Sequence, residues 1–314
     1  MQVPRADFDT ALAQSVARMG VPVDFETTVT AIEFDDHGYS RTAIKRADGQ
    51  VQTIRANFIV DASGYGRVIP RLFNLDRPSN LEPRKAVFAH VEDKHRDHFD
   101  EPNRIIVVIY QPGVWVWIIP FSNGITSLGF VANPDFFNDK GDDQKTQFRN
   151  LIDSHPYLNK RFGDQPWAWE PRKLEAWSTT TDKFYGNGFV LTGNVTEFLD
   201  PIFSSGVMFA AVSSHLAAKL VVRQLNGEHV NWDDEYMGVI QQGVDTFRSY
   251  VMSWYDGTLE KIFFAKNPDK LIKKQICSVL AGYVWDRSNP YVRNHDSALQ
   301  RLSKLIDYQN KIKE

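Results

Sequence analysis

Cysteine is nearly absent from this chain, since Cys277 is the only one among 314 residues. One thiol cannot form an internal disulfide, a CxxC redox pair or a thiolate zinc cluster, so these roles are excluded. A free cysteine that packs in the core of a protein in a reducing compartment is the ordinary alternative. We therefore expect Cys277 to be buried and the protein to be cytoplasmic.

Excess basic charge and long apolar runs are also missing. The 36 Lys and Arg residues against 39 Asp and Glu give a formal net charge of −3, whereas general nucleic-acid binding requires a basic face. No apolar run approaches the roughly 20 residues that span a bilayer, and the N-terminus lacks the apolar core of a signal peptide. We expect no nucleic-acid partner and no membrane span.

A complete glycine-rich dinucleotide motif is the third absence. A dinucleotide-binding α/β protein normally begins with a strand, a GxGxxG turn and a helix, and the glycines let the backbone approach the pyrophosphate. The nearest match in this chain is Gly64-Tyr65-Gly66-Arg67, which lacks the third glycine. The composition, 42% apolar and 24% charged, is otherwise that of a globular protein large enough for more than one lobe.

The first quarter of the chain predicts a helix followed by short strands. Residues 6–19 carry apolar side chains at helical spacing, and Gly20 supplies a stop. Turn chemistry in residues 36–38 and 48–49 indicates an antiparallel meander. The unbroken apolar run at 57–61 suits a strand buried on both faces of a parallel sheet. The other predicted strands are residues 21–25, 29–34, 40–47 and 51–55.

The second block predicts an antiparallel sheet. Four runs rich in Val, Ile, Phe and Trp are separated mainly by glycine-containing turns at hairpin spacing. The charged run 93–101 contains His95 and His98, but no apolar frame fixes these imidazoles, so we favour a solvated loop and expect no metal. The four predicted strands are residues 85–92, 104–111, 114–121 and 125–131.

The last part returns to α/β character and then becomes helical. Residues 188–192 predict a strand, 193–201 a loop, and 204 to about 223 a helix. Ser204, Ser205 and Gly206 stand where that helix begins, so free backbone N–H groups and the positive end of the helix dipole face outward. Such a site suits an anion or the electron-rich edge of a flavin. A plain N-capped helix is the alternative, because Ser-Ser-Gly is a common cap.

Four motifs in the same order resemble those of the flavin-dependent halogenases, a branch of the FAD-dependent monooxygenase-like superfamily. Residues 193–207 (GNVTEFLDPIFSSGV) are similar to the family's late flavin-contact motif, and residues 3–9 to its Arg-x-x-Phe-Asp helix opening. Residues 59–64 (IVDASG) resemble its strand-end DASG motif. Residues 115–120 (WVWIIP) resemble its WxWxIP signature, which is the most specific of the four.

The resemblance implies a site for FAD, with chloride or bromide as co-substrate. It implies a halide position beside Ser205 and Gly206. Trp115 and Trp117 point to the same side of a strand, and the resemblance implies that they line a tunnel to the substrate; two core tryptophans are the alternative. The residues implied to contact the cofactor are Arg5, Asp61, Ser63, Gly64, Gly193, Asn194, Asp200, Pro201, Ser205 and Gly206.

Three departures from the family pattern bear on function. Asn194 replaces an acid and so loses a charge-assisted hydrogen bond to a ribityl hydroxyl. Phe203 stands where the tryptophan-type halogenases carry a glutamate, so the chain looks more like halogenases acting on phenols, pyrroles or carrier-tethered substrates. The segment that supplies GxGxxG and the catalytic lysine has no counterpart here. We therefore expect an N-terminally truncated chain and name no catalytic residue.

The implied fold is an incomplete FAD-binding Rossmann-like domain with an inserted antiparallel sheet and a C-terminal helical region. The implied reaction is halogenation of an electron-rich aromatic, either free or held by a carrier protein, using oxygen, halide and reduced FAD from a separate flavin reductase. The alternatives are an aromatic hydroxylase, an isoprenoid reductase, or an inactive truncated chain that lacks the pyrophosphate-binding motif. The expected division is 1–84 (partial FAD-binding), 85–185 (antiparallel sheet), 186–225 (return to the FAD-binding domain) and 226–314 (helical).

Overall fold

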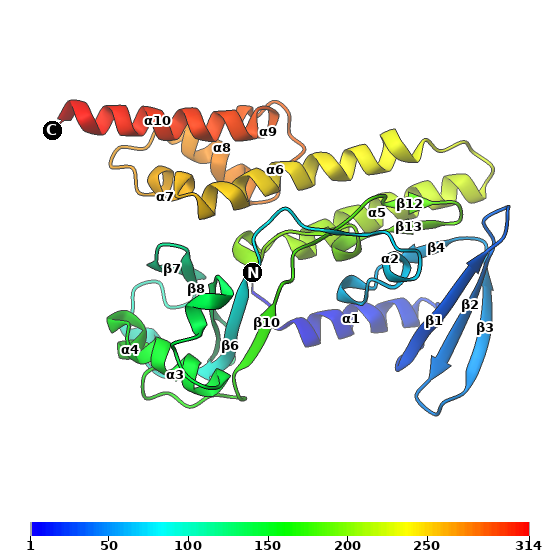
Figure 1. The fold of residues 1–314 in the computed structure, drawn as a ribbon, viewed down its shortest axis with the longest axis horizontal. Helices are drawn as coiled ribbons and strands as arrows, with labels where there is room; N and C mark the ends of the chain where they lie inside the picture. Colours follow the sequence, from blue (N-terminus) through cyan, green and yellow to red (C-terminus); the bar gives the residue numbers. More distant parts are fainter. Residues whose placement is uncertain (1, 314) are drawn as a thin grey trace. The chain divides into compact units, whose positions relative to one another are not determined.

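The computed structural model describes residues 2–313 and has the mixed α/β fold that the sequence predicts (Figure 1). The chain forms two compact units. Unit 1 comprises Met1–Phe25 and Glu82–Trp177, and unit 2 comprises Glu26–Leu81 and Ser178–Glu314. The four-part division expected above stays a prediction; the contacts group the first helix with the antiparallel sheet rather than with residues 26–81.

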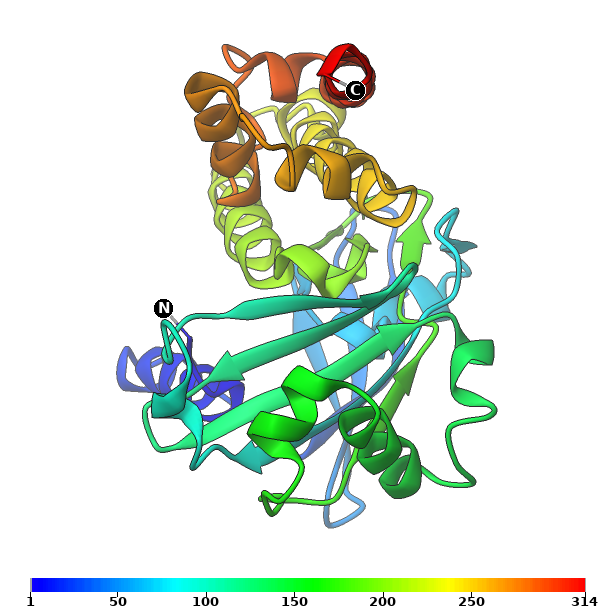
Figure 2. The same cartoon turned by 90° about the vertical axis from the view of Figure 1, so that its left-hand side faces the viewer.

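Unit 1 is built on a five-stranded antiparallel sheet, in the order β10-β6-β9-β8-β7. Helices α3 and α4 pack on one face of it (Figure 2), where Val116, Leu128 and Phe130 meet Phe148 and Leu151 in a buried core. The elements of this unit are α1 (Arg5–Arg18), β6 (Lys85–Glu92), β7 (Ile106–Gln111), β8 (Val114–Pro120), β9 (Ile125–Ala132), α3 (Gln144–Asp153), α4 (Pro156–Phe162) and β10 (Arg172–Glu175).

Buried charges stabilise one edge of this core. Asp93 follows β6, and the Arg161 guanidinium from α4 donates to its carboxylate over 3.1 and 2.7 Å. Arg96 and Thr126 donate to the same carboxylate over 3.2 and 2.6 Å. Burial opposes ionisation of Asp93, but the hydrogen bonds from Arg161 and Thr126 outweigh it, so the pKa of Asp93 is lowered. The charged run 93–101, which the sequence predicts to be a solvated loop, therefore begins with Asp93, an acid that is buried and hydrogen-bonded.

Unit 2 contains a three-stranded meander and a short parallel pair. The meander has the order β1-β2-β3 that the turn chemistry predicts. Gly38, in its first turn, has φ +83°, and a Cβ there would lie 2.6 Å from the Asn187 Oδ1 atom, so glycine allows this close approach. The strands are β1 (Thr27–Phe34), β2 (Ser40–Arg46), β3 (Val51–Ala56), β4 (Ile59–Asp61), β5 (Asp76–Pro78), β11 (Thr179–Thr181), β12 (Tyr185–Gly186), β13 (Phe189–Leu191) and β14 (Glu197–Phe198).

The rest of unit 2 is helical, as predicted. Within residues 2–313, one helix, α5, is long and apolar enough to cross a membrane by length and composition alone, which is weak evidence because core helices of soluble proteins meet the same criterion. The absence of a membrane span therefore stays a prediction. The helices of unit 2 are α2 (Val68–Leu72), α5 (Gly206–Leu225), the π-helix η6 (Asp233–Met237), α6 (Gly238–Tyr255), α7 (Thr258–Phe263), α8 (Lys270–Leu280), α9 (Pro290–Arg293) and α10 (His295–Lys313).

Three local predictions were wrong. Residues 21–25 form no strand but an irregular segment that connects α1 to β1. Val60 in β4 is 43% exposed, so this strand is not buried on both faces; it lies at the edge of its sheet, after β12 and β13. Cys277 is exposed on α8 rather than packed in the core, because the buried stripe of that helix runs through Ile276 and Val279.

Replacing Arg161 tests the buried ion pair. We expect Arg161→Met to lower the free energy of unfolding by about 3–5 kcal/mol, because it leaves Asp93 buried with a partly uncompensated charge. The pKa of Asp93 is lower in the folded state, so its stabilisation is fully present above roughly pH 4, the value for an unfolded Asp, and is lost as the pH falls through the folded pKa. The decrease in the free energy of unfolding caused by Arg161→Met should therefore become smaller below roughly pH 4.

Chemical denaturation of both proteins between pH 3 and pH 7 provides the measurement. The double variant Asp93→Leu, Arg161→Met serves as the control, because removing both charges together should recover much of the stability. An Arg161→Met chain as stable as the parent at pH 7 would contradict the assigned role of the pair.

Candidate functional site

The parallel pairing of β4 with β13 brings two distant motifs together. Asp61, the last residue of β4, is in register with Leu191, the last residue of β13. The Thr192 N–H donates to the Asp61 carbonyl oxygen over 2.9 Å. The strand-end motif at 59–64 and the loop at 193–207 therefore both follow the carboxyl ends of two neighbouring parallel strands. This is where α/β proteins place ligands.

The Asp61 side chain holds the turn that follows it. One carboxylate oxygen accepts from the Ser63 N–H and the other from the Ile69 N–H, both over 2.8 Å. The Ser63 hydroxyl oxygen in turn accepts from the Val68 N–H over 2.9 Å. Both side chains are thus used within the loop. Gly64 has φ +59° and no atom within 4 Å of an added Cβ, so open space lies beside its backbone.

Arg67 joins this turn to the second loop, and the sequence analysis did not identify it. The residue is 4% exposed and adopts a left-handed conformation with φ 46°. Its guanidinium donates to the Asn194 and Val195 carbonyls over 3.1 and 3.3 Å, and it contacts Asp76 at 2.6 Å. Further donations reach the Thr179 hydroxyl, the Thr180 carbonyl and the Thr181 hydroxyl.

Gly193 and Asn194 lie against the start of α5. Gly193 has φ +57°, and an added Cβ would meet the Ala210 Cβ at 3.1 Å, so the backbone rests directly on this helix. Its N–H donates to the Ser213 hydroxyl over 2.8 Å. A Cβ on Gly206 would lie 3.6 Å from the Asn194 Oδ1 atom. The Asn194 amide therefore lies beside the first turn of α5.

Asp200 and Pro201 shape the entry into that helix. The Asp200 carboxylate accepts from the Ile202 N–H over 3.0 Å and from the Tyr255 hydroxyl over 3.0 Å. The 3₁₀ turn Pro201–Phe203 ends at Ser204, whose φ of 52° is left-handed. Asp200 is 4% exposed, so it acts as an internal cap within this turn.

The N-terminus of α5 carries no side-chain cap. The helix begins at Gly206, two residues later than predicted, and the Ser205 side chain at the N-cap position makes no capping hydrogen bond. The first N–H groups of a helix have no partner within it, and a 20-residue helix places partial positive charge at this end. The plain N-capped helix, the alternative considered above, is therefore not observed.

Two aromatic residues flank this region and were also missed by the sequence analysis. The rings of Tyr65 and Phe198 meet edge to face with centroids 5.4 Å apart. Tyr65 is 48% exposed, and partial burial raises the pKa of its phenol. Tyr65 and Arg67 belong to the Gly64–Arg67 segment, which was considered above only for its glycines.

Arg5, Trp115 and Trp117 belong to unit 1, so their predicted roles at this site stay predictions. Arg5 is the first residue of α1, and its guanidinium donates to the Asp9 carboxylate over 3.0 and 2.8 Å. The two indoles share one face of β8, as predicted, but they are tilted by 51° with centroids 6.0 Å apart rather than stacked. Trp117 covers Gly129, where an added Cβ would clash with the indole at 2.1 Å.

Arg67 is testable as the residue that fixes the two loops. We expect Arg67→Met to lower the free energy of unfolding by about 2–4 kcal/mol, because it leaves several buried carbonyl and hydroxyl groups without a donor. Amide hydrogen exchange at Val195 and Thr196 should accelerate, since the loop loses its anchor. Arg71→Met is the matched control, because that guanidinium makes one 3.3 Å contact with the Tyr65 carbonyl. Equal exchange rates in both variants would contradict the role of Arg67.

Comparison with known proteins gives a consistent family. The profile of the tryptophan halogenase family matches residues 1–297. A 1H-pyrrole-2-carbonyl-[peptidyl-carrier protein] brominase of Pseudoalteromonas luteoviolacea is 26% identical over 299 residues, which are 91% of this chain and 70% of the relative. The corresponding chlorinase of Pseudomonas fluorescens is 25% identical over 291 residues, which are 90% of this chain and 64% of the relative.

Two solved structures are similar to this chain in fold. A flavoprotein/dehydrogenase from Cytophaga hutchinsonii superimposes with a TM-score of 0.95 at 49% identity, covering 98% of this chain and 76% of that one. The flavin-dependent brominase Bmp2 superimposes with a TM-score of 0.85 at 22% identity, with the same coverage, and supports the fold. Because the family profile spans nearly the whole sequence, the chain belongs to the tryptophan halogenase family of flavin-dependent halogenases.

Proposed function

We propose that this chain forms the flavin- and halide-facing part of a halogenase that acts on an electron-rich aromatic ring. The observation that carries the proposal is the uncapped N-terminus of α5, which the Asn194 loop adjoins. Family membership gives the chemistry its class, because the family uses FAD and halide. We further propose that the protein works in the cytoplasm with a separate flavin reductase.

The backbone at this end of α5 suits the ring system of FAD. Gly206 has no side chain, and its nearest neighbours to an added Cβ, Asn194 and Phe198, are at an ordinary contact distance of 3.6 Å. Backbone N–H groups at a helix start suit the electron-rich edge of the ring. When bound, reduced FAD would activate oxygen for the two-electron oxidation of halide, and the protein would supply orientation and electrostatics.

Ser205 and Gly206 would hold the halide through the first N–H groups of α5. A monovalent anion gains from both the unpaired donors and the dipole of this helix. Asn194 would add an uncharged amide beside this turn, with its Oδ1 atom 3.6 Å from the position of an added Cβ on Gly206. In this proposal, Trp115 and Trp117 line the route toward the substrate, and their indoles exclude water from it.

We propose a phenol or a pyrrole as the substrate, held by a carrier protein. Two observations support this choice. Phe203 replaces the glutamate of the tryptophan-type enzymes, and two relatives are named for action on a pyrrole-2-carbonyl group bound to a peptidyl-carrier protein. A second candidate is a flavoenzyme that does not halogenate, because the structure at 49% identity is described as a flavoprotein/dehydrogenase.

A reconstituted reaction separates these candidates. The purified chain is incubated with FAD, a flavin reductase, NADH, oxygen and a pyrrole-2-carbonyl carrier protein, with and without bromide or chloride, and products are identified by mass spectrometry. We expect the chain to retain FAD and to yield a halogenated product only when halide is present. An oxygenated product that forms equally without halide would favour the second candidate. A chain that retains no FAD would contradict both.

Gly206→Ala tests the halide position. Gly206 does not have a positive φ, and an added methyl group has ordinary contact distances, so the variant should keep the parent's melting temperature. We expect the KM for bromide to rise about tenfold, or ~1.4 kcal/mol, because the methyl group screens the first N–H groups of the helix. Ser214→Ala, two turns along α5, is the matched control. An unchanged KM for bromide in Gly206→Ala would place the halide elsewhere.

A further inference from the structure

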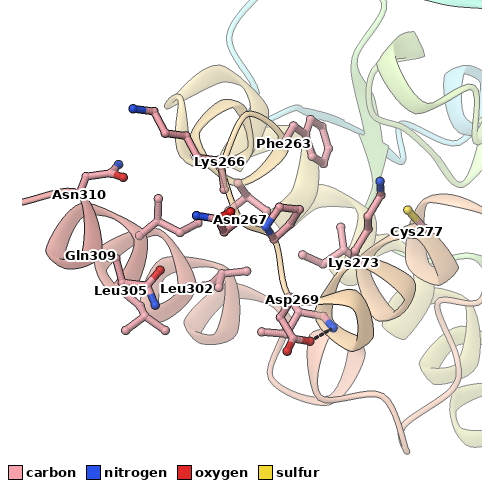
Figure 3. A pocket seen from close by; sticks show the side chains of 16 residues that line it. Phe263, Lys266, Asn267, Asp269, Lys273, Cys277, Leu302, Leu305, Gln309 and Asn310 are labelled. Atoms are coloured by element: carbon pink, nitrogen blue, oxygen red, sulfur yellow. Dashed lines mark hydrogen bonds between the residues drawn. The ribbon is translucent and has the colours of Figure 1, made fainter. Parts of the chain in front are cut away.

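A cavity lies among the C-terminal helices of unit 2. Its volume is about 350 Å³, within the range of ligand pockets. Side chains from α7, α8 and α10 and from the loop between α7 and α8 surround it (Figure 3). All its lining residues lie between 262 and 310, whereas the loops described above end at residue 207. The cavity is therefore separate in sequence and in structural elements from the proposed flavin site.

The interior of this cavity is apolar. Ile262 and Ile276 are 8% and 3% exposed and form its inner wall. Phe263 and Leu305 are 41% and 49% exposed and line its opening. Monomeric proteins rarely leave large apolar side chains grouped around a hollow without a ligand or partner. The space suits an unbranched alkyl chain better than a polar ligand.

The charge at the edge of the cavity is positive. Residues 258–314 contain eleven Lys and Arg against six Asp and Glu, whereas the remaining 257 residues contain 25 against 33. Lys266 and Lys273 line the cavity, and their ammonium groups lie on opposite sides of the group of side chains in Figure 3. Asp269, the one acid in the lining, is engaged as the N-cap of α8, where it accepts from the Leu271 and Ile272 N–H groups.

We propose that this cavity binds an amphipathic monoanion, with its alkyl chain against Ile262 and Ile276 and its carboxylate at the Lys273 ammonium group. The apolar interior and the cationic edge each recognise one part of such a molecule. A neutral alcohol of the same length lacks the second interaction, and an alkylammonium ion is repelled by it. The proposal is independent of the halogenase function, because it involves neither FAD nor halide.

Cys277 provides a built-in reporter of occupancy. It is the only cysteine of the chain, it is exposed, and it lines the cavity one turn after Lys273. A bound alkyl chain would shield its thiol. The reaction of the purified chain with the neutral reagent 4,4′-dithiodipyridine therefore measures occupancy without any FAD, so a negative result here and a failure of halogenation are distinguishable.

The first measurement is the reaction rate at increasing concentrations of hexanoate, octanoate and decanoate, each below its micelle concentration. We expect saturable protection of Cys277, with affinity rising about fourfold for each added methylene group until the cavity is full. Decanol and decyltrimethylammonium should bind at least tenfold more weakly than decanoate. Decanol that protects as well as decanoate, or protection only above the micelle concentration, would overturn the proposal.

The second measurement compares matched variants. We expect Lys273→Met, which keeps the apolar stem, to weaken decanoate binding about tenfold and to leave decanol binding unchanged. Lys274→Met is the control, because its side chain follows on the same helix but does not line the cavity. Leu305→Trp should fill the opening and abolish protection while leaving the circular dichroism spectrum unchanged. Equal loss in Lys273→Met and Lys274→Met would mean that net charge, not this cavity, attracts the anion.

Discussion

The parallel pairing of β4 with β13 is the constraint on which the candidate site depends. It joins residues about 130 positions apart and aligns Asp61 with Leu191, so that two loops leave the sheet at the same edge. Three residues per strand cannot fix those loops alone. Arg67 adds what the strands lack, because one buried guanidinium holds the Asn194 and Val195 carbonyls from the neighbouring turn. The strand pairing determines where the two loops leave the sheet, and Arg67 fixes the conformation of the loop that contains Asn194 and Val195.

Features with a local signal could be predicted from the sequence. The meander follows from turn chemistry at residues 36–38 and 48–49, and the antiparallel sheet follows from runs of β-branched and aromatic residues. The start of α5 was predicted to within two residues from Ser-Ser-Gly. The family was predicted from four motifs in order, and the family profile confirms it. In each case, the relevant residues are neighbours in sequence.

Features that depend on distant partners could not be predicted in this way. Arg67 looks like any surface arginine until Asp76, Thr179 and Asn194 are brought around it. Asp93 begins a run of charges, and only the fold places Arg161 and Thr126 against it. Cys277 was expected in the core from a general tendency, but the rotation of α8 turns it outward. Composition carries no information about which face of a helix is covered.

Unit 2 contains two features for which we propose anion binding, and they differ in physical origin. At α5 the proposed attraction comes from fixed backbone N–H groups, which belong to the rigid first turn of the helix. At the C-terminal cavity it comes from lysine ammonium groups on flexible stems beside an apolar hollow. Rigid dipoles suit a monatomic halide, whose contacts must be short and which offers no apolar surface. Flexible cations suit a carboxylate whose position is determined by the burial of its alkyl chain. The proposed halide site therefore selects its ligand by electrostatics alone, whereas the proposed cavity site selects its ligand by apolar burial together with electrostatics.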